Sequence, residues 1–222
     1  MISVAVCSPD DDLIEPWNDL VARAPANVFM SPVALKAARD LNYADVRVLA
    51  AWDDSVTPRR LVGLWALQVK RRAPLMPSIA LALPYTYAFL SSPVVDPAFT
   101  AEVVPAFLAT IRGNRTLPNV VALNDMDGES PAFAAMKQDV AARRRSYVQM
   151  GGTARPVVTR EFGVKASGST RKKLRQDWNR LSAEGKVEIL NARDAEGVGQ
   201  AFEIFLTMEA ASWKGGNGTA LL

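Results

Sequence analysis

Apolar and polar positions along the chain follow two different periods, which together predict a mixture of strands and helices. Short apolar runs, several of them rich in β-branched residues, predict strands at 2–7, 46–52, 60–72, 79–90 and 119–124. Apolar residues at helical spacing predict helices that begin near Asp11 or Asp12, at Ser31-Pro32, at 98 and at Ser130-Pro131. Residues 146–150 and 155–162 are interpreted as a closing pair of strands.

The last third of the chain repeats the pattern of the first part. Leu174, Trp178 and Leu181 share one face of a predicted helix over 167–185, a strand is predicted at 187–192, and a second helix at 194–213. Strand, acidic cap, long helix and the start of another helix thus recur in the order seen from residue 2 onward. The pattern favours a complete unit over 1–162 and the beginning of a second unit over 163–222. The alternative, that two unrelated β-α stretches look alike, stays open.

Composition excludes several kinds of chemistry. The 222 residues contain no histidine, which rules out Ser-His-Asp and Cys-His catalysis and HExxH zinc sites. The lone Cys7 excludes a disulfide framework or a thiolate metal cluster, and a single reduced thiol is typical of a cytoplasmic protein. A net charge of +3 is too small to indicate nucleic-acid binding. The apolar run 79–90 is too short to span a membrane and contains Pro84.

The motifs of the last third resemble the GNAT acyltransferase superfamily. The resemblance is carried by the basic helix Ser169 to Gly185 and by the run from Met208-Glu209 through Trp213-Lys214-Gly215 to Gly218-Thr219-Ala220. It is most similar to the tandem GNAT proteins of the CelD/BcsL type, which are linked to cellulose biosynthesis and related to the Fem transferases. Phe29, Ser31 and Pro32 match an early turn of that family, but Val33-Ala34-Leu35 stand where an aromatic is usual.

The resemblance implies a fold and a reaction. The fold is α/β (α+β), with a GNAT-like mixed, mostly antiparallel central sheet flanked by helices, followed by a helix-strand-helix that begins a second GNAT unit. The activity is acyl transfer from acetyl-CoA, without a metal, to an amine or hydroxyl acceptor such as a small molecule, a sugar or a polysaccharide precursor. The family members are longer, so this chain would lack most of the second unit, and its partner would be that unit or a second copy.

The coenzyme loop expected from the resemblance is absent from the first unit. A pyrophosphate needs small residues and free backbone N–H groups at a helix N-terminus. The junction 89–99 has no glycine, two prolines and Asp96. A literal glycine match, Gln149 to Ala154, is interpreted as a turn between strands. We therefore expect no acetyl-CoA site in this chain and little or no turnover by it alone.

Two groups of residues remain candidates for substrate binding. Arg171, Lys172 and Arg175, together with Lys173, lie in the first turns of a helix and either hold an anion with the Ser169 and Thr170 hydroxyls or form a solvated basic face. The second group is the run Trp213-Lys214-Gly215-Gly216, interpreted either as a helix C-cap with a glycine stop or as a wall of the acceptor groove. Glu209 lies one turn before Trp213 on the same face, where it is expected to orient Lys214 or an acceptor amine.

Two further alternatives stay open. Asp125, Asp127 and Glu129 form either a turn with a helix cap or a substrate contact, and no general base can be named. The second possible function of the whole chain is a non-catalytic binding or assembly module that holds an anionic ligand or a partner.

Overall fold

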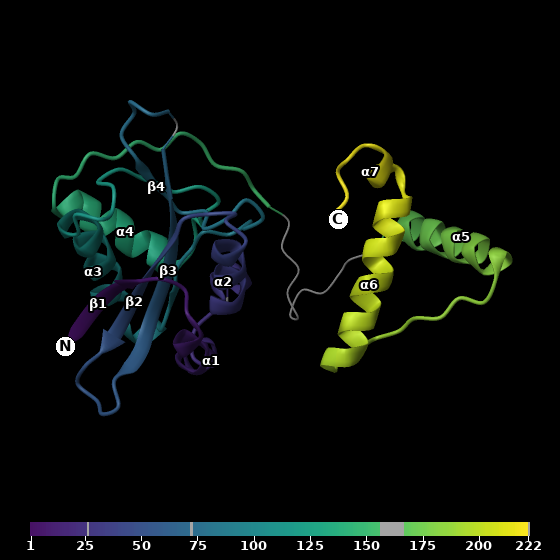
Figure 1. Ribbon diagram of the computed structural model, residues 1–222, viewed down its shortest axis with the longest axis horizontal. Coiled ribbons are helices and arrows are strands. Elements are labelled where there is room, and N and C mark those ends of the chain that lie inside the picture. Colours follow the sequence, from purple (N-terminus) through teal and green to yellow (C-terminus); the bar gives the residue numbers. More distant parts are fainter. Residues whose placement is uncertain (26, 72, 156–166, 222) are drawn as a thin grey trace. The chain divides into compact units, whose positions relative to one another are not determined.

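The chain folds as two compact units, Met1–Met150 and Gly151–Leu222 (Figure 1). The computed structural model describes residues 1–25, 27–71, 73–155 and 167–221. The predicted boundary between residues 162 and 163 lies outside the described residues. No helix of the described chain combines the length and apolarity that a membrane crossing requires.

The first unit is built around one mixed sheet. Its strands follow the order β1-β2-β3-β4-β6, and β5 also pairs with β3. The bounds of the strands are β1 Ile2–Cys7, β2 Val46–Asp53, β3 Arg60–Lys70, β4 Ile79–Leu81, β5 Val94–Val95 and β6 Val121–Ala122. All neighbours are antiparallel except β4 and β6, which are parallel. The predicted mixed, mostly antiparallel sheet flanked by helices is confirmed.

The apolar run 79–90 forms a strand only at its start. β4 pairs with the end of β3, Gln68 lying opposite Leu81, and β5 pairs with the same strand further back, Leu64 lying opposite Val94. Residues 82–93 therefore leave the sheet opposite residues 65–67 of β3 and return to it at β5. The prediction of one strand over 79–90 is wrong beyond Leu81, because apolar residues indicate burial and not strand pairing.

The helices of the first unit begin largely where the sequence predicts. Ser31 and Ser130 stand at the N-caps of α2 and α4, each with proline at the first helical position, and the Ser130 hydroxyl accepts from Phe133 N. The prediction that Asp11 or Asp12 caps α1 is wrong, because both residues belong to a 3-10 turn that leads into this helix. The bounds are η1 Asp11–Leu13, α1 Ile14–Val21, η2 Val28–Met30, α2 Pro32–Asp40, η3 Pro97–Phe99, α3 Thr100–Gly113 and α4 Pro131–Ala142.

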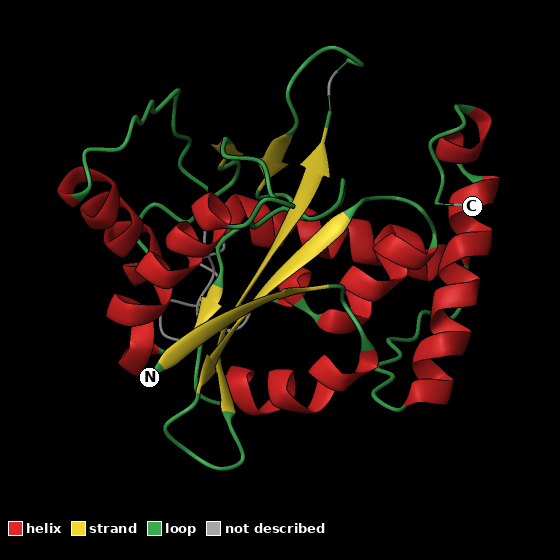
Figure 2. Ribbon diagram, turned by 60° about the vertical axis from the view of Figure 1, so that its left-hand side comes forward, coloured by secondary structure: helices red, strands yellow, loops and turns green. Residues whose placement is uncertain are grey.

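Helices cover the sheet of the first unit, and its strands twist across one another (Figure 2). Helix α3 packs closely on β3, where Phe107 contacts the Trp65 ring at 6.0 Å between centroids and both side chains are fully buried. Gly63 of β3 lets α3 approach, since a Cβ there would lie 2.6 Å from Val103 Cγ1. The core of this unit runs from α1 and α2 through the sheet to α3 and α4.

The second unit contains helices and no strand among its described residues. Its elements are α5 Gly168–Glu184, α6 Ala195–Ala211 and the short α7 Trp213–Gly216. The strand predicted at 187–192 is not formed, because no described segment of this unit offers it a pairing partner. Residues 146–150 form no strand either, and of the predicted strand 155–162 residues 156–162 lie outside the described residues.

Apolar side chains of the second unit stay exposed. Among residues 167–221 only Glu209 is buried, while Trp178, Leu181, Phe202 and Met208 are all about half exposed or more. This unit therefore has no hydrophobic core of its own within the described chain.

Candidate functional site

The returning end of the 82–93 segment is fixed from several directions. Asn27 Nδ2 donates to Leu90 O at 3.0 Å and to Ser92 O at 2.8 Å, and Trp65 Nε1 donates to Ser91 O at 3.0 Å. Asn27, Ser91 and Ser92 are all buried. Each buried carbonyl of this turn thus has a partner, as a buried backbone requires.

The same turn is joined to the segment that follows β6. Ser91 N donates to Asp125 O at 3.2 Å, and the Ser91 hydroxyl donates to Asn124 O. Asp127 N donates to the Ser92 hydroxyl at 3.0 Å. These three bonds hold residues 91–92 against 124–127, beyond the point where β4 and β6 pair.

A carboxylate already occupies the start of α3. Asp96 follows β5, is buried, and accepts a hydrogen bond from Ala98 N at 3.1 Å. Arg23 Nε lies 3.2 Å from Asp96 Oδ2, and Arg23 also donates to Leu61 O at 3.0 Å. Pro97, the next residue, has no N–H to offer. The residues at this junction do not fit a pyrophosphate. Asp96 already places a negative charge there, and the donors that a pyrophosphate would need, Arg23 and Ala98 N, already bind Asp96.

The glycine-containing segment 149–154 does not provide a pyrophosphate site either. It belongs to no helix or strand, and no helix begins between it and the end of the described stretch at Arg155. Because neither flank is a described strand, the interpretation as a turn between strands is not supported. Its backbone N–H groups are not aligned by a helix N-terminus either.

The basic residues of α5 are exposed at its N-terminal end. None of Arg171, Lys172, Lys173 and Arg175 forms an ion pair with a described residue. The helix is capped by Ser167, whose hydroxyl accepts from Thr170 N at 3.2 Å and contacts the Ser169 and Thr170 hydroxyls at 2.8 and 2.9 Å. The Ser169 and Thr170 hydroxyls thus contact the capping hydroxyl, and anion binding by this helix end stays a prediction.

Glu209 and Lys214 meet at the turn between α6 and α7. The Lys214 ammonium donates to Glu209 Oε1, and Leu221 N donates to Glu209 Oε2 at 3.0 Å. The hydrogen bond from Lys214 lowers the pKa of Glu209, with help from the Leu221 amide, and outweighs the effect of burial. Glu209 is therefore a buried, ionised carboxylate with a matched partner, and the predicted contact with Lys214 is present.

The residues after Ser212 begin a helix instead of ending one. The Ser212 hydroxyl donates to Glu209 O at 2.7 Å and accepts from Lys214 N at 3.2 Å, so it closes α6 and caps α7. A Cβ on Gly215 would lie 1.8 Å from Ala210 O, which requires glycine there. The interpretation of 213–216 as a C-cap with a glycine stop is therefore wrong. Trp213 begins α7 and is 71% exposed.

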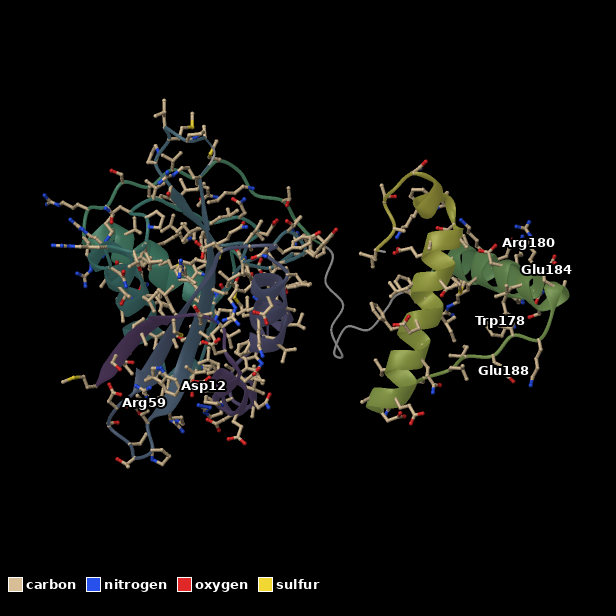
Figure 3. The ribbon with its side chains drawn as sticks, in the orientation of Figure 1. Asp12, Arg59, Trp178, Arg180, Glu184 and Glu188 are labelled. Atoms are coloured by element: carbon tan, nitrogen blue, oxygen red, sulfur yellow. The ribbon has the colours of Figure 1, made fainter. Side chains whose placement is uncertain are left out.

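The structure brings only some of the predicted residues together. Glu209, Lys214 and Gly215 share the turn between α6 and α7, with Trp213 beside them in sequence. Arg171, Lys172 and Arg175 share α5, and no hydrogen bond or ion pair between described side chains joins them to that turn. Figure 3 labels Trp178 and Arg180 further along α5 and Glu188 on the segment that follows it.

Asp127 and Glu129 form a turn that leads into α4. Asp127 Oδ1 accepts from Glu129 N at 3.0 Å, and the Ser130 hydroxyl donates to Asp127 O at 2.7 Å. The interpretation of this stretch as a turn and helix cap is confirmed for these residues. Within the described ranges, no three His, Cys, Asp or Glu side chains gather as a metal site would require.

Sequence reasoning missed the buried turn Ser91-Ser92 and its partner Asn27. Asn27 immediately precedes a 3-10 turn, where its side chain accepts from Phe29 N at 3.2 Å. That local signal predicts a cap, but its two bonds to residues 90 and 92 depend on tertiary structure.

Comparisons with known proteins give little beyond the geometry. No protein-family model matches the chain, and no curated protein matches it. Among solved structures, an acetyltransferase of Trypanosoma brucei is similar at a TM-score of 0.40 and 15% identity, over 69% of this chain and 99% of that chain. This overlap is too loose to assign a role to any residue here.

Proposed function

We propose that this chain is part of an acyltransferase in which residues 1–150 are a non-catalytic GNAT-like scaffold. The transfer itself would move an acyl group from acetyl-CoA to an amine or hydroxyl acceptor, the reaction class that the motifs of residues 169–220 resemble. The observation that carries the scaffold role is Asp96, a buried carboxylate paired with Arg23 where a coenzyme phosphate would need free donors.

A rearrangement of the junction between β5 and α3 would also cost free energy. Residues 90–92, which lead into β5, are held by Asn27 and Trp65 and by the segment 124–127. Opening the loop for a pyrophosphate would leave several buried polar groups without partners, each at a cost of about 1–3 kcal/mol. A coenzyme site in the first unit is therefore disfavoured by structure as well as by composition.

The second unit is proposed to supply the acceptor side. Its α5 and α6 expose apolar side chains that a sheet or another subunit would cover, as expected for the beginning of a second GNAT unit. Glu209 holds the Lys214 ammonium at the turn where the resemblance implies an acceptor groove. Lys214 would contribute charge and position there. No residue of the chain is assigned as the general base.

Isothermal titration of the 222-residue chain with acetyl-CoA tests the scaffold role. We expect no saturable heat at micromolar to submillimolar coenzyme, because the first unit lacks a phosphate site. Asp96→Ala should not create one, and the exposed Asp54→Ala is the matched control for the same change in net charge. Saturable binding that tightens in Asp96→Ala but not in Asp54→Ala would overturn the proposal, since it would place the coenzyme at this junction.

A second candidate function, an anion-holding module, is favoured by the cations in the first turns of α5, which pair with no described carboxylate: Arg171, Lys172, Lys173 and Arg175. Amide chemical shifts recorded during titration with inorganic phosphate test it. Saturable shifts in residues 167–175 that weaken in both Arg171→Ala and Lys172→Ala support this function. Lys186→Ala is the control, because Lys186 already pairs with Glu188. Equal weakening by all three variants identifies a general charge effect and refutes it.

A further inference from the structure

An open cavity of about 420 Å³ lies at the end of the first unit where β2 and β3 are joined. Its apolar walls come from α1, from the β2–β3 connection and from the start of β3, and they comprise Pro16, Val56, Pro58 and Leu61. This volume falls within the range of about 300–1,000 Å³ found for small-molecule sites. Figure 3 labels Arg59 at this end of the sheet.

The cavity carries a positive charge that no described carboxylate compensates. Arg59 lines it, and its guanidinium lies 4.4 Å from the centroid of the Trp52 ring. None of the described carboxylates forms an ion pair with Arg59. A guanidinium held by a ring keeps its N–H donors available, and a ligand that binds it loses less side-chain entropy on binding.

Arg60 adds a second cation to the same lining. Its guanidinium lies 5.9 Å from the centroid of the Phe99 ring, and its buried Nε has no hydrogen-bond partner in the described chain. A buried N–H donor without a partner is unfavourable, so a bound acceptor nearby would be stabilised.

The acidic groups around the cavity are already engaged. Asp19 lines it but lies 3.1 Å from Arg23 Nη2. Asp53, across the hairpin from Arg60, accepts from the Ser55 amide at 3.0 Å and from the Ser55 hydroxyl at 2.6 Å. The hydrogen bond from the Ser55 hydroxyl is the main reason why the pKa of Asp53 is lowered, ahead of the charge of Arg60. The lining therefore holds two arginines and one acid, Asp19, which is already paired with Arg23.

We propose that this cavity binds a compact organic anion, whose carboxylate or phosphate monoester contacts Arg59 while its apolar body rests on Pro16, Val56, Pro58 and Leu61. The planar guanidinium matches either anion with two parallel N–H donors. The prolines give rigid walls that need no ordering on binding. The lining residues all belong to the first unit and do not include Asp96, so the proposal does not depend on acyl transfer.

Amide chemical shifts of the whole chain, recorded with phenyl phosphate and with benzoate, test this site. We expect saturable shifts at residues 15–19 and 55–61 with at least one of the two anions, and the tighter one identifies the anionic group. Benzyl alcohol, the neutral analogue, and inorganic phosphate, which lacks the apolar body, should both bind more weakly. Benzyl alcohol binding as tightly as the anions, or no saturable shift with either anion, overturns the proposal.

Substitutions of Arg59 test whether its guanidinium binds the anion. Arg59→Ala should weaken the anion by roughly tenfold or more, as expected for a charge-assisted hydrogen bond, and Arg59→Lys by less. Arg47→Ala is the matched control, since it removes the same charge from β2 but Arg47 pairs with Asp45 away from the cavity. Arg59 is exposed, so these variants are expected to fold, and an unchanged unfolding midpoint confirms it. Equal weakening by Arg47→Ala overturns the assignment.

Discussion

The packing of α3 on β3 gives the sharpest quantitative prediction, and it concerns Gly63. An added Cβ would lie 2.6 Å from Val103 Cγ1 and 3.2 Å from Phe107 Cζ, whereas ordinary van der Waals contact begins at 3.4 Å. Overpacking of this kind costs about 1–3 kcal/mol. Alanine also reduces the conformational freedom of the unfolded chain, which stabilises the folded unit by about 0.4–1 kcal/mol. Gly63→Ala should therefore destabilise the first unit by about 1–2 kcal/mol.

A double-mutant cycle with Val103→Ala separates this clash from other effects. Val103 is fully buried, so the single change should cost about 2–3 kcal/mol through lost burial and a small cavity. In the double variant the methyl group added at position 63 occupies space that the Val103 methyl has left. The two losses should therefore sum to less than their independent values by about 1 kcal/mol or more.

Urea unfolding followed by tryptophan fluorescence measures all three variants. The buried tryptophans, which change environment on unfolding, belong to the first unit, whereas the exposed ones, Trp178 at 47% and Trp213 at 71%, belong to the second. Gly113→Ala is the matched control, because a Cβ there would meet nothing within 4 Å. Strict additivity in the cycle, or an equal loss in Gly113→Ala, would refute the described packing of α3 against Gly63.

Three further outcomes follow from the structure. Cys7 should react with iodoacetamide more slowly in the folded chain than in urea. Burial, and to a smaller extent the nearby aspartates, raises the pKa of the Cys7 thiol above 9.0, which leaves less of the reactive thiolate. Equal rates in the two states would contradict the described burial of Cys7. Asp96→Asn keeps an acceptor for Ala98 N but removes the charge facing Arg23, and should lower the free energy of unfolding by about 1–3 kcal/mol, with no loss arguing against the pair. Lys214 lowers the pKa of Glu209 below its ordinary 4.5, so the contact should be complete above that pH and lost as the pH falls through the folded value. The protection of the Leu221 amide, its intrinsic exchange rate divided by its observed rate at each pH, should fall on acidification, and in Lys214→Met it should fall at a higher pH; a protection that does not change with pH would contradict the contact.

Local signals were enough to predict many helix starts and the central hairpin. Ser31-Pro32 and Ser130-Pro131 fix two helix starts, because the serine stands at the cap and the proline needs no hydrogen-bond acceptor at the first turn. The runs 46–52 and 60–72 pair with each other as β2 and β3, where neighbouring strands in sequence meet with little loop entropy. Both features depend on residues close together in the chain.

Features that depend on distant residues could not be predicted. The run 79–90 is apolar throughout, but Ser91 and Ser92 return it to the segment 124–127, so residues 82–93 are fixed by side-chain and backbone bonds outside the sheet. The Glu209–Lys214 contact was predictable because the two residues are only five positions apart. The site around Arg59 was not, since its walls come from α1 and from the β2–β3 connection with the start of β3, which are far apart in sequence.

In the second unit, polar contacts fix local structure although its described residues form no hydrophobic core. Glu209, a charged residue, is its one buried described side chain, and it stays buried because Lys214 and the Leu221 amide match its charge and its lone pairs. Polar contacts therefore fix the turn from α6 to α7, while the apolar side chains of both long helices face outward. Helices of 17 residues are marginal in water without tertiary packing. A surface that covered their exposed apolar side chains would therefore stabilise both α5 and α6.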